Sequence, residues 1–124
     1  MSESILTRKQ LGELGERLAA AYLEQNGYQI HGRNWRCRTG EIDIIAMEGK
    51  VLVFVEVRTR SGRSTFGTPQ ESVNYKKQLQ VMETAQWYIH RFQLQSLQPR
   101  FDVVSVLTDK AGQLVKLDHI QNAF

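Results

Sequence analysis

Two acidic residues, Asp43 and Glu56, stand in neighbouring β-rich runs of the chain. Residues 41–46 and 51–58 are rich in Ile and Val and flank a short segment, 47–50, that contains a glycine. Two such runs around a short glycine-containing loop predict a β-hairpin. Depending on the loop, Asp43 falls opposite Val55 or opposite Glu56. Either register brings the two carboxylates close together if their faces of the sheet match.

A carboxylate pair beside a buried apolar strand needs to be neutralised. Like charges across a sheet are destabilising, and ionised groups next to the apolar run 51–55 lose solvation. Either a divalent cation lies between the oxygens, or Arg58 neutralises them in a static ion pair. Hard oxygen ligands with no His or Cys nearby favour Mg²⁺ or Mn²⁺ over zinc. A third interpretation is that Glu41, Asp43, Glu56 and Arg58 form only a solvated ladder of charges.

Basic residues cluster in three places along the chain. The clusters are Arg33, Arg36 and Arg38; Arg58, Arg60 and Arg63; and Lys76 with Lys77. Because the clusters flank the acidic runs, they can form a rim that follows the phosphates of a nucleic acid around a metal site. The alternative is that they are solvated loop charges. The formal net charge of +3 permits a polyanionic partner without requiring one.

The elements that must position these residues follow from hydrophobic periodicity. A leucine stripe (Leu11, Leu14 and Leu18, continued by Tyr22) predicts a helix over residues 11–25. A second helix is expected from an N-cap at Asn74 to Ile89. Strands are expected at 28–36, in the two hairpin runs, at 101–107 and at 114–120, with a polar loop at 59–69. The order α-β-β-β-α-β-β implies a mixed sheet with helices packed on it, because a strand–helix–strand passage makes a parallel crossover.

Length and composition indicate one ordinary folded domain. At 124 residues, with 41% hydrophobic and 23% charged residues, the chain can build one core, and we expect residues 1–124 to be a single domain. No apolar run approaches the roughly 20 residues that span a bilayer, and the N-terminal residues lack the apolar segment of an export signal. The one cysteine, Cys37, cannot form an internal disulfide. These features predict a cytoplasmic protein without a membrane partner.

The motifs around the acidic pair resemble those of a known family. The run GEIDIIA at residues 40–46 is followed by FVEVRTR at residues 54–60. Together with GERLA at 15–19, Gly27-Tyr28, NWR at 34–36 and Lys77-Gln78, these runs resemble the YraN-like family of bacterial proteins. The resemblance covers about residues 11–107. That family in turn resembles the PD-(D/E)XK restriction-endonuclease-like nuclease superfamily, which includes Holliday-junction resolvases.

The resemblance implies an α/β fold with a restriction-endonuclease-like α-β-β-β-α-β core and Mg²⁺-dependent cleavage of nucleic-acid phosphodiesters. It implies that Asp43 and Glu56 bind the metal and that Arg58 stands where the superfamily has a lysine. Glu16 matches an acid of the first helix that completes the metal site, and Gln78 a polar residue of the second helix that lines it. Ile42 replaces the superfamily's proline, which is a mild departure.

The arginine at position 58 is the departure that bears on activity. A guanidinium group cannot lose its proton near neutral pH, so Arg58 cannot act as a base, although it can stabilise charge on a phosphate. Glu16 is the other open position: at about 100° per residue it lies roughly 140° from the leucine stripe, so the helix alone allows a site residue or a surface glutamate.

Two functions from different classes remain at this stage. The first is a metal-dependent endonuclease that acts on DNA. The alternative is a nucleic-acid-binding module of the same fold with little or no cleavage activity. The choice between DNA and RNA, the substrate structure and a homodimer are left open.

Overall fold

The computed structural model describes residues 6–62 and 73–124, and its elements follow the α-β-β-β-α-β-β order expected from the sequence. The elements are α1 (Arg8–Gln25), β1 (Gln29–Cys37), β2 (Gly40–Glu48), β3 (Val51–Ser61), α2 (Tyr75–Arg91), β4 (Gln98–Thr108) and β5 (Leu114–Ile120). Arg63 and most of the polar loop expected at 59–69 lie outside the described residues.

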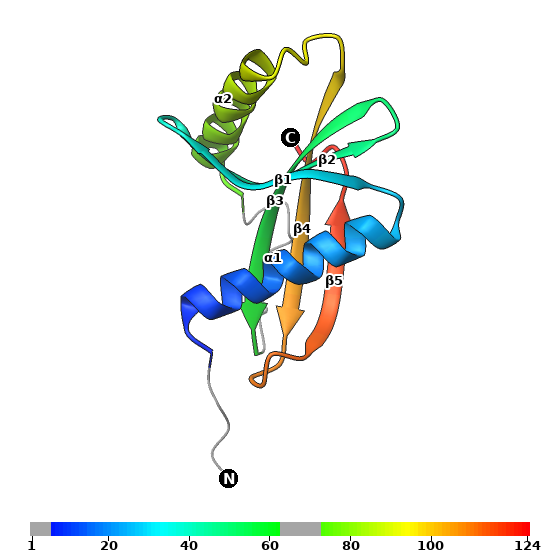
Figure 1. Ribbon diagram of the computed structural model, residues 1–124. Helices are drawn as coiled ribbons and strands as arrows, with labels where there is room; N and C mark the ends of the chain where they lie inside the picture. Colours follow the sequence, from blue (N-terminus) through cyan, green and yellow to red (C-terminus); the bar gives the residue numbers. More distant parts are fainter. Residues whose placement is uncertain (1–5, 63–72) are drawn as a thin grey trace.

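The strands form one mixed sheet in the order β1-β2-β3-β4-β5 (Figure 1). Neighbouring strands are antiparallel except β3 and β4, which are parallel because the chain passes through α2 between them. Ala19 and Leu23 of α1 pack on one face of the sheet, and Ala85, Tyr88 and Ile89 of α2 pack on the other. The expected α/β fold class is confirmed.

The helix α1 begins at a capping box and approaches the sheet through small residues. Thr7 Oγ1 accepts from the Gln10 amide at 3.1 Å, and Gln10 Oε1 accepts from the Thr7 amide at 2.9 Å. Gly15 lies against the Thr59 side chain so closely that a Cβ at position 15 would overlap it. Because Gly15 has no side chain, α1 can approach β3 closely at Thr59, near the C-terminal end of the strand.

The most deeply buried face of α1 lies to one side of the leucine stripe. The buried residues are Gly15, Ala19, Ala20 and Leu23, and the leucines at 11, 14 and 18 are only half-buried. Small side chains allow close approach to the sheet, so packing selects them over the larger leucines. On a helical wheel at about 100° per residue, Glu16 falls between Ala19 and Ala20, on the face toward the sheet.

The helix α2 begins where the sequence indicated. Asn74 Oδ1 accepts from the Lys77 amide at 2.8 Å, which makes Asn74 the N-cap. Tyr88 meets Trp35 of β1 edge-to-face, with ring centroids 5.2 Å apart. Trp35 thus packs between sheet and helix.

A largely buried ion pair joins Arg100 and Asp102 of β4. Arg100 Nη2 lies 2.9 Å from Asp102 Oδ2, and Arg100 Nη1 lies 2.8 Å from Glu48 Oε1. His119 Nε2 is 2.8 Å from the same Asp102 oxygen. Burial alone would raise the pKa of Asp102, but the hydrogen bonds from His119 and Arg100 outweigh it and hold the pKa below its ordinary value. Asp102 thus has a structural role in this part of the sheet.

Candidate metal centre

The strands β2 and β3 separate at one point, and the acidic pair lies there. Their paired residues run from Glu48↔Val51 to Ile44↔Val55 and then stop. Beyond that point β2 continues to pair with β1, while β3 continues with β4. Asp43 and Glu56 are the first residues past the last pair, so the register selects Glu56 as the partner of Asp43. We call this opening between β2 and β3 the fork.

Backbone geometry at the fork orients Asp43. Because β2 no longer pairs with β3, the Val57 amide is free of the ladder, and it donates to Asp43 Oδ2 at 2.8 Å. Burial, followed by the charge of Glu56 and hydrogen bonding with its carboxyl group, raises the pKa of Asp43 to about 8. The register thus brings the two acids to the same point of the sheet, and that they hold one ion together stays a prediction.

Two cations accompany Glu56, which is buried. Arg58 Nη2 lies 3.4 Å from Glu56 Oε2, and Lys77 Nζ lies 3.6 Å from the same oxygen. Arg58 comes from the same strand as Glu56, two residues further along, whereas Lys77 comes from the first turns of α2. Arg58 therefore does not neutralise the pair alone, and its terminal contact is longer than a good charge-assisted hydrogen bond.

Glu16 reaches the edge of the fork from α1. Burial, the charge of Asp43 and the charge of Glu41 raise the pKa of Glu16, and a hydrogen bond from the Asn34 side chain partly offsets the increase. Asn34 has a left-handed backbone (φ 51°), and by the β1–β2 register it stands opposite Asp43. The charge of Asp43 therefore acts on Glu16, although the two acids are far apart in the sequence.

The remaining candidate residues lie beside the fork and bind elsewhere. The Gln78 side chain donates to the Val73 carbonyl at 2.9 Å, so it orders the start of α2. Glu41 forms an ion pair with Arg36, with Oε2 3.0 Å from Nε. The structure places Gln78 near the site through α2 and shows no contact of its side chain with either carboxyl.

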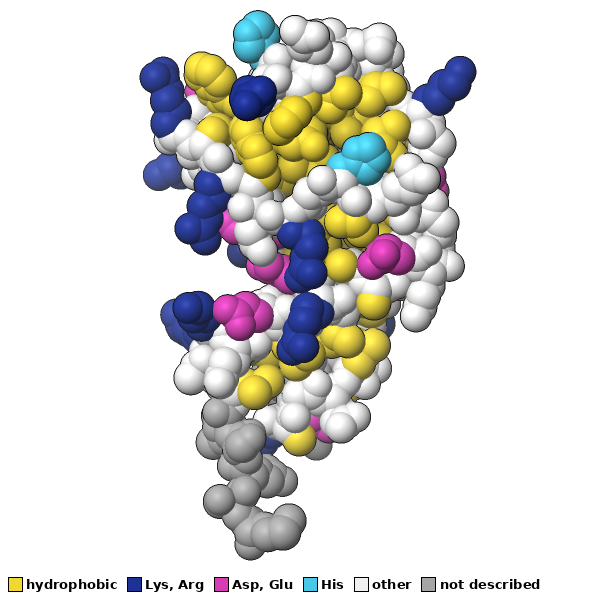
Figure 2. Space-filling view, viewed as in Figure 1, with side chains coloured by type: hydrophobic (Ala, Val, Ile, Leu, Met, Phe, Trp, Pro, Cys, Tyr) yellow, Lys and Arg dark blue, Asp and Glu magenta, His cyan; other side chains and the backbone are white. Residues whose placement is uncertain are grey.

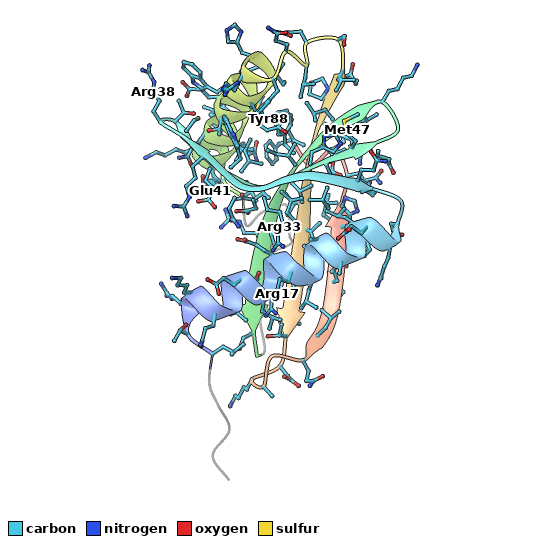
Figure 3. The ribbon with its side chains drawn as sticks, viewed as in Figure 1. Arg17, Arg33, Arg38, Glu41, Met47 and Tyr88 are labelled. Atoms are coloured by element: carbon cyan, nitrogen blue, oxygen red, sulfur yellow. The ribbon has the colours of Figure 1, made fainter. Side chains whose placement is uncertain are left out.

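Open grooves lie beside the fork on the sides of both helices. On the α1 side, Glu16, Val57 and Arg58 line a groove of about 490 Å³. On the α2 side, Glu41, Lys77 and neighbours line one of about 380 Å³. Figure 2 shows acidic and basic side chains gathered at an indentation between α1 and the part of the molecule above it. Figure 3 shows Glu41 and Arg33 on the side of this region toward β1 and Arg17 on α1.

The donor set fits magnesium with only a few protein ligands. Within residues 6–62 and 73–124 no three His, Cys, Asp or Glu side chains form a group that could hold a metal ion, and a metal-binding role of Glu16 stays a prediction. Mg²⁺ is commonly held by one or two carboxylates, with water and substrate phosphate completing its shell. Asp43 and Glu56 provide two such carboxylates, and a cation bound there would compete with the proton of Asp43.

Comparison with known proteins identifies the family. The model of a family described as "Uncharacterised protein family UPF0102" matches residues 15–106, which include all five candidate residues. The chain belongs to the UPF0102 family. A UPF0102 protein of Moorella thermoacetica is 46% identical over 119 residues, covering 96% of this chain and 98% of the relative. One from Caldicellulosiruptor bescii is 48% identical over 118 residues, covering 94% and 98%.

UPF0102 membership confirms the resemblance to the YraN-like family that the motifs indicated. None of the helices in the described part of this UPF0102 protein is long and apolar enough to cross a membrane.

Three features of the site were not assigned from the sequence. Lys77 was placed in the basic rim, whereas the structure brings it to Glu56. Asn34 was only part of a family motif, although asparagine's tolerance of left-handed backbone marks it as a residue for such a position. The Val57 amide carries no signal in the sequence, because a backbone donor becomes available only where strand pairing ends.

Proposed function

We propose that this protein is a metal-dependent endonuclease that hydrolyses phosphodiester bonds of nucleic acid, with DNA as its substrate. The observation that carries the proposal is the placement of Asp43 and Glu56 side by side at the fork, where burial and Glu56 raise the pKa of Asp43. A buried pair of carboxyl groups costs stability, so its presence at an accessible fork favours a functional role. Mg²⁺ or Mn²⁺ is the expected cofactor.

Each residue of the fork has a distinct task in this mechanism. Asp43 and Glu56 would hold the cation, and the Val57 amide fixes one Asp43 oxygen so that the other is turned to the fork. Asp43 would have to be ionised to act as a ligand, so metal binding there would be favoured as the pH rises. A bound Mg²⁺ would supply a water of lowered pKa and charge stabilisation at the phosphate. Glu16 stands at the rim, where it can orient a water molecule with the help of Asn34.

The cations of the fork bind and stabilise the phosphate. Arg58 cannot accept a proton, so its task is to neutralise the charge that develops on the phosphate oxygens. Lys77 brings an ammonium group to the same carboxylate from α2, and it supplies the lysine that position 58 lacks. The Arg33 and Arg36 side chains of β1 extend the positive charge beyond the fork and favour a polyanionic substrate.

A binding module without cleavage activity is the alternative function. It is favoured by Arg58, which stands where the superfamily has a lysine and whose Nη2 lies 3.4 Å from Glu56 Oε2. In that case the fork would bind a cation or a phosphate without hydrolysis.

A cleavage assay with matched variants tests the proposal. The full chain is incubated with labelled single-stranded, duplex and branched DNA, with Mg²⁺, Mn²⁺ or EDTA. We expect cleavage that requires the metal and falls by about 100-fold or more in Asp43→Asn, because several kcal/mol of transition-state stabilisation is lost. Glu41→Gln is the matched control, since Glu41 is a nearby acid already paired with Arg36.

The outcomes separate the two functions. Metal-dependent binding without product from any substrate would favour the binding module. Cleavage that survives Asp43→Asn unchanged would exclude the fork as the active site and point to a contaminating nuclease.

A further inference from the structure

Two exposed aromatic side chains lie at the C-terminal end of α2, outside the fork. Trp87 is 41% exposed and Phe92 is 46% exposed, and neither belongs to the buried face of the helix. Large aromatic rings left at the surface are a common feature of binding surfaces. We call Trp87, Phe92 and the two arginines described next the stacking surface.

Each of these rings makes a cation–π contact with an arginine. The Arg38 guanidinium carbon lies 5.3 Å from the centroid of the Trp87 ring, and that of Arg91 lies 5.3 Å from the centroid of Phe92. Neither guanidinium forms an ion pair with another described residue, so both charges are open to a phosphate. Glu83 and His90 line the shallow groove beside Trp87, and Glu83 is the one acid there among the groove's lining residues.

The stacking surface is joined to the fork by α2 itself. Lys77, which contacts Glu56, and Trp87 are ten residues apart on the helix, or about 15 Å at 1.5 Å per residue. The turn between β1 and β2 lies alongside: Gln80 Nε2 donates to the Thr39 carbonyl at 3.1 Å, and the Thr39 and Thr84 hydroxyls are 2.9 Å apart. This packing places Arg38 over Trp87.

Figure 3 shows the Arg38 side chain at the tip of that turn, beside α2. Figure 2 shows a broad apolar area in the upper part of the molecule, with Lys and Arg side chains at its border. A polyanion that leaves the fork along α2 would therefore meet Arg38 and the exposed ring of Trp87.

We propose that the stacking surface binds an unpaired segment of nucleic acid next to the cleavage position, so that the substrate carries a single-stranded part. This inference rests on the proposed nuclease function and names its substrate class. Bases in a duplex are already stacked on one another, and only unpaired bases can stack on protein aromatics. A distance of about 15 Å corresponds to about four stacked nucleotides at 3.4 Å each. Arg38 and Arg91 would hold the phosphates that flank the stacked bases.

The test compares binding of a single strand, a blunt duplex of the same sequence and a duplex with a single-stranded tail. Fluorescence anisotropy of labelled DNA is measured in EDTA, so that binding is read without cleavage. We expect Trp87→Ala to weaken binding of the single strand and of the tailed duplex by about 5- to 100-fold, with blunt-duplex binding changed less than about twofold. Trp87→Phe should recover part of the loss, because a smaller ring still stacks.

Tyr75→Ala is the matched control. Tyr75 is also an exposed aromatic residue of α2, at 72%, and no described arginine lies over its ring. Its removal should leave all three affinities unchanged. Arg38→Gln should lower the slope of log affinity against log salt for the single strand by about 0.7, the value for one phosphate contact. Circular dichroism confirms that each variant is folded.

The outcomes distinguish this inference from the proposed function. Equal loss of single-strand and duplex binding in Trp87→Ala, or no loss in either, would overturn the stacking surface. So would a wild-type protein that binds blunt duplex as tightly as the tailed one. Metal-dependent cleavage measured in parallel decides the nuclease function separately: selective binding without cleavage would leave the stacking surface standing and remove the nuclease.

Discussion

Asp43→Asn should stabilise the metal-free protein. The pKa of Asp43 is about 8 in the folded chain and 3.8 in its ordinary state, because of burial and of Glu56. A raised pKa contributes stability that is complete below pH 3.8 and is lost as the pH rises toward 8. Between pH 3.8 and pH 7, at 1.36 kcal/mol for each pH unit, the free energy of unfolding decreases by roughly 4 kcal/mol. Asparagine does not ionise, still accepts from the Val57 amide and can donate to Glu56, so we expect a gain of about 2 to 4 kcal/mol at pH 7.

Urea unfolding followed by circular dichroism measures the effect. In EDTA, the wild-type free energy of unfolding should fall between pH 5 and pH 8, and that of Asp43→Asn should fall less. Excess Mg²⁺ should stabilise the wild type, since an ion that binds only the folded state shifts the equilibrium, and it should have little effect on Asp43→Asn. The metal-induced gain should be larger at pH 8 than at pH 5, because the ion has to displace the proton.

Glu41→Gln is the control for a general effect of removing negative charge. Glu41 is a partly exposed acid paired with Arg36, so its loss should change stability by no more than about 1 kcal/mol. The reasoning is refuted if Asp43→Asn is no more stable than the wild type at pH 7 in EDTA, or if Mg²⁺ stabilises both proteins equally.

Three further outcomes are expected. In the cleavage assay Arg58→Lys should retain or raise the rate, because lysine keeps the charge, whereas Arg58→Ala should lower it; an unchanged rate in Arg58→Ala would remove that residue from the site. Gly15→Ala should destabilise the protein by about 1 to 3 kcal/mol in urea unfolding, since its Cβ would overlap Thr59, whereas Gly12→Ala, with no atom near its added Cβ, should be neutral or stabilising by up to about 1 kcal/mol. The pKa of Asp102 is held low against the effect of its burial, so wild-type stability should decline as the pH falls below about 4. Asp102→Asn should lose about 1 to 3 kcal/mol near pH 7, because Arg100 would keep only Glu48 as an acidic partner; equal urea midpoints for the two proteins would contradict this.

Much of the fold could be predicted from local pattern. The β-rich runs 41–46 and 51–58 around a short glycine-containing loop predicted the hairpin, which places Asp43 opposite Val55 or Glu56. Asn74 was identified as the N-cap of α2, since its side chain satisfies an amide three residues away. These features depend on contacts between residues close in sequence or directly across a short hairpin.

The buried face of α1 could not be predicted in the same way. The leucine stripe gave the helix its position in the chain but not its orientation, because the orientation depends on how closely Gly15 approaches Thr59 of β3. That contact turns Glu16 toward the acids, and the sequence alone left Glu16 equally suited to the surface.

Sequence by itself determined the elements, their order and the pair of acids, since the periodicities of helix and strand are properties of the local chain. Only the tertiary structure decided that β2 and β3 separate after Ile44 and Val55, and that Lys77 of α2 meets Glu56. The raised pKa of Asp43 also depends on the tertiary structure, because burial and neighbouring charges come from residues that are distant in sequence and are brought together by packing.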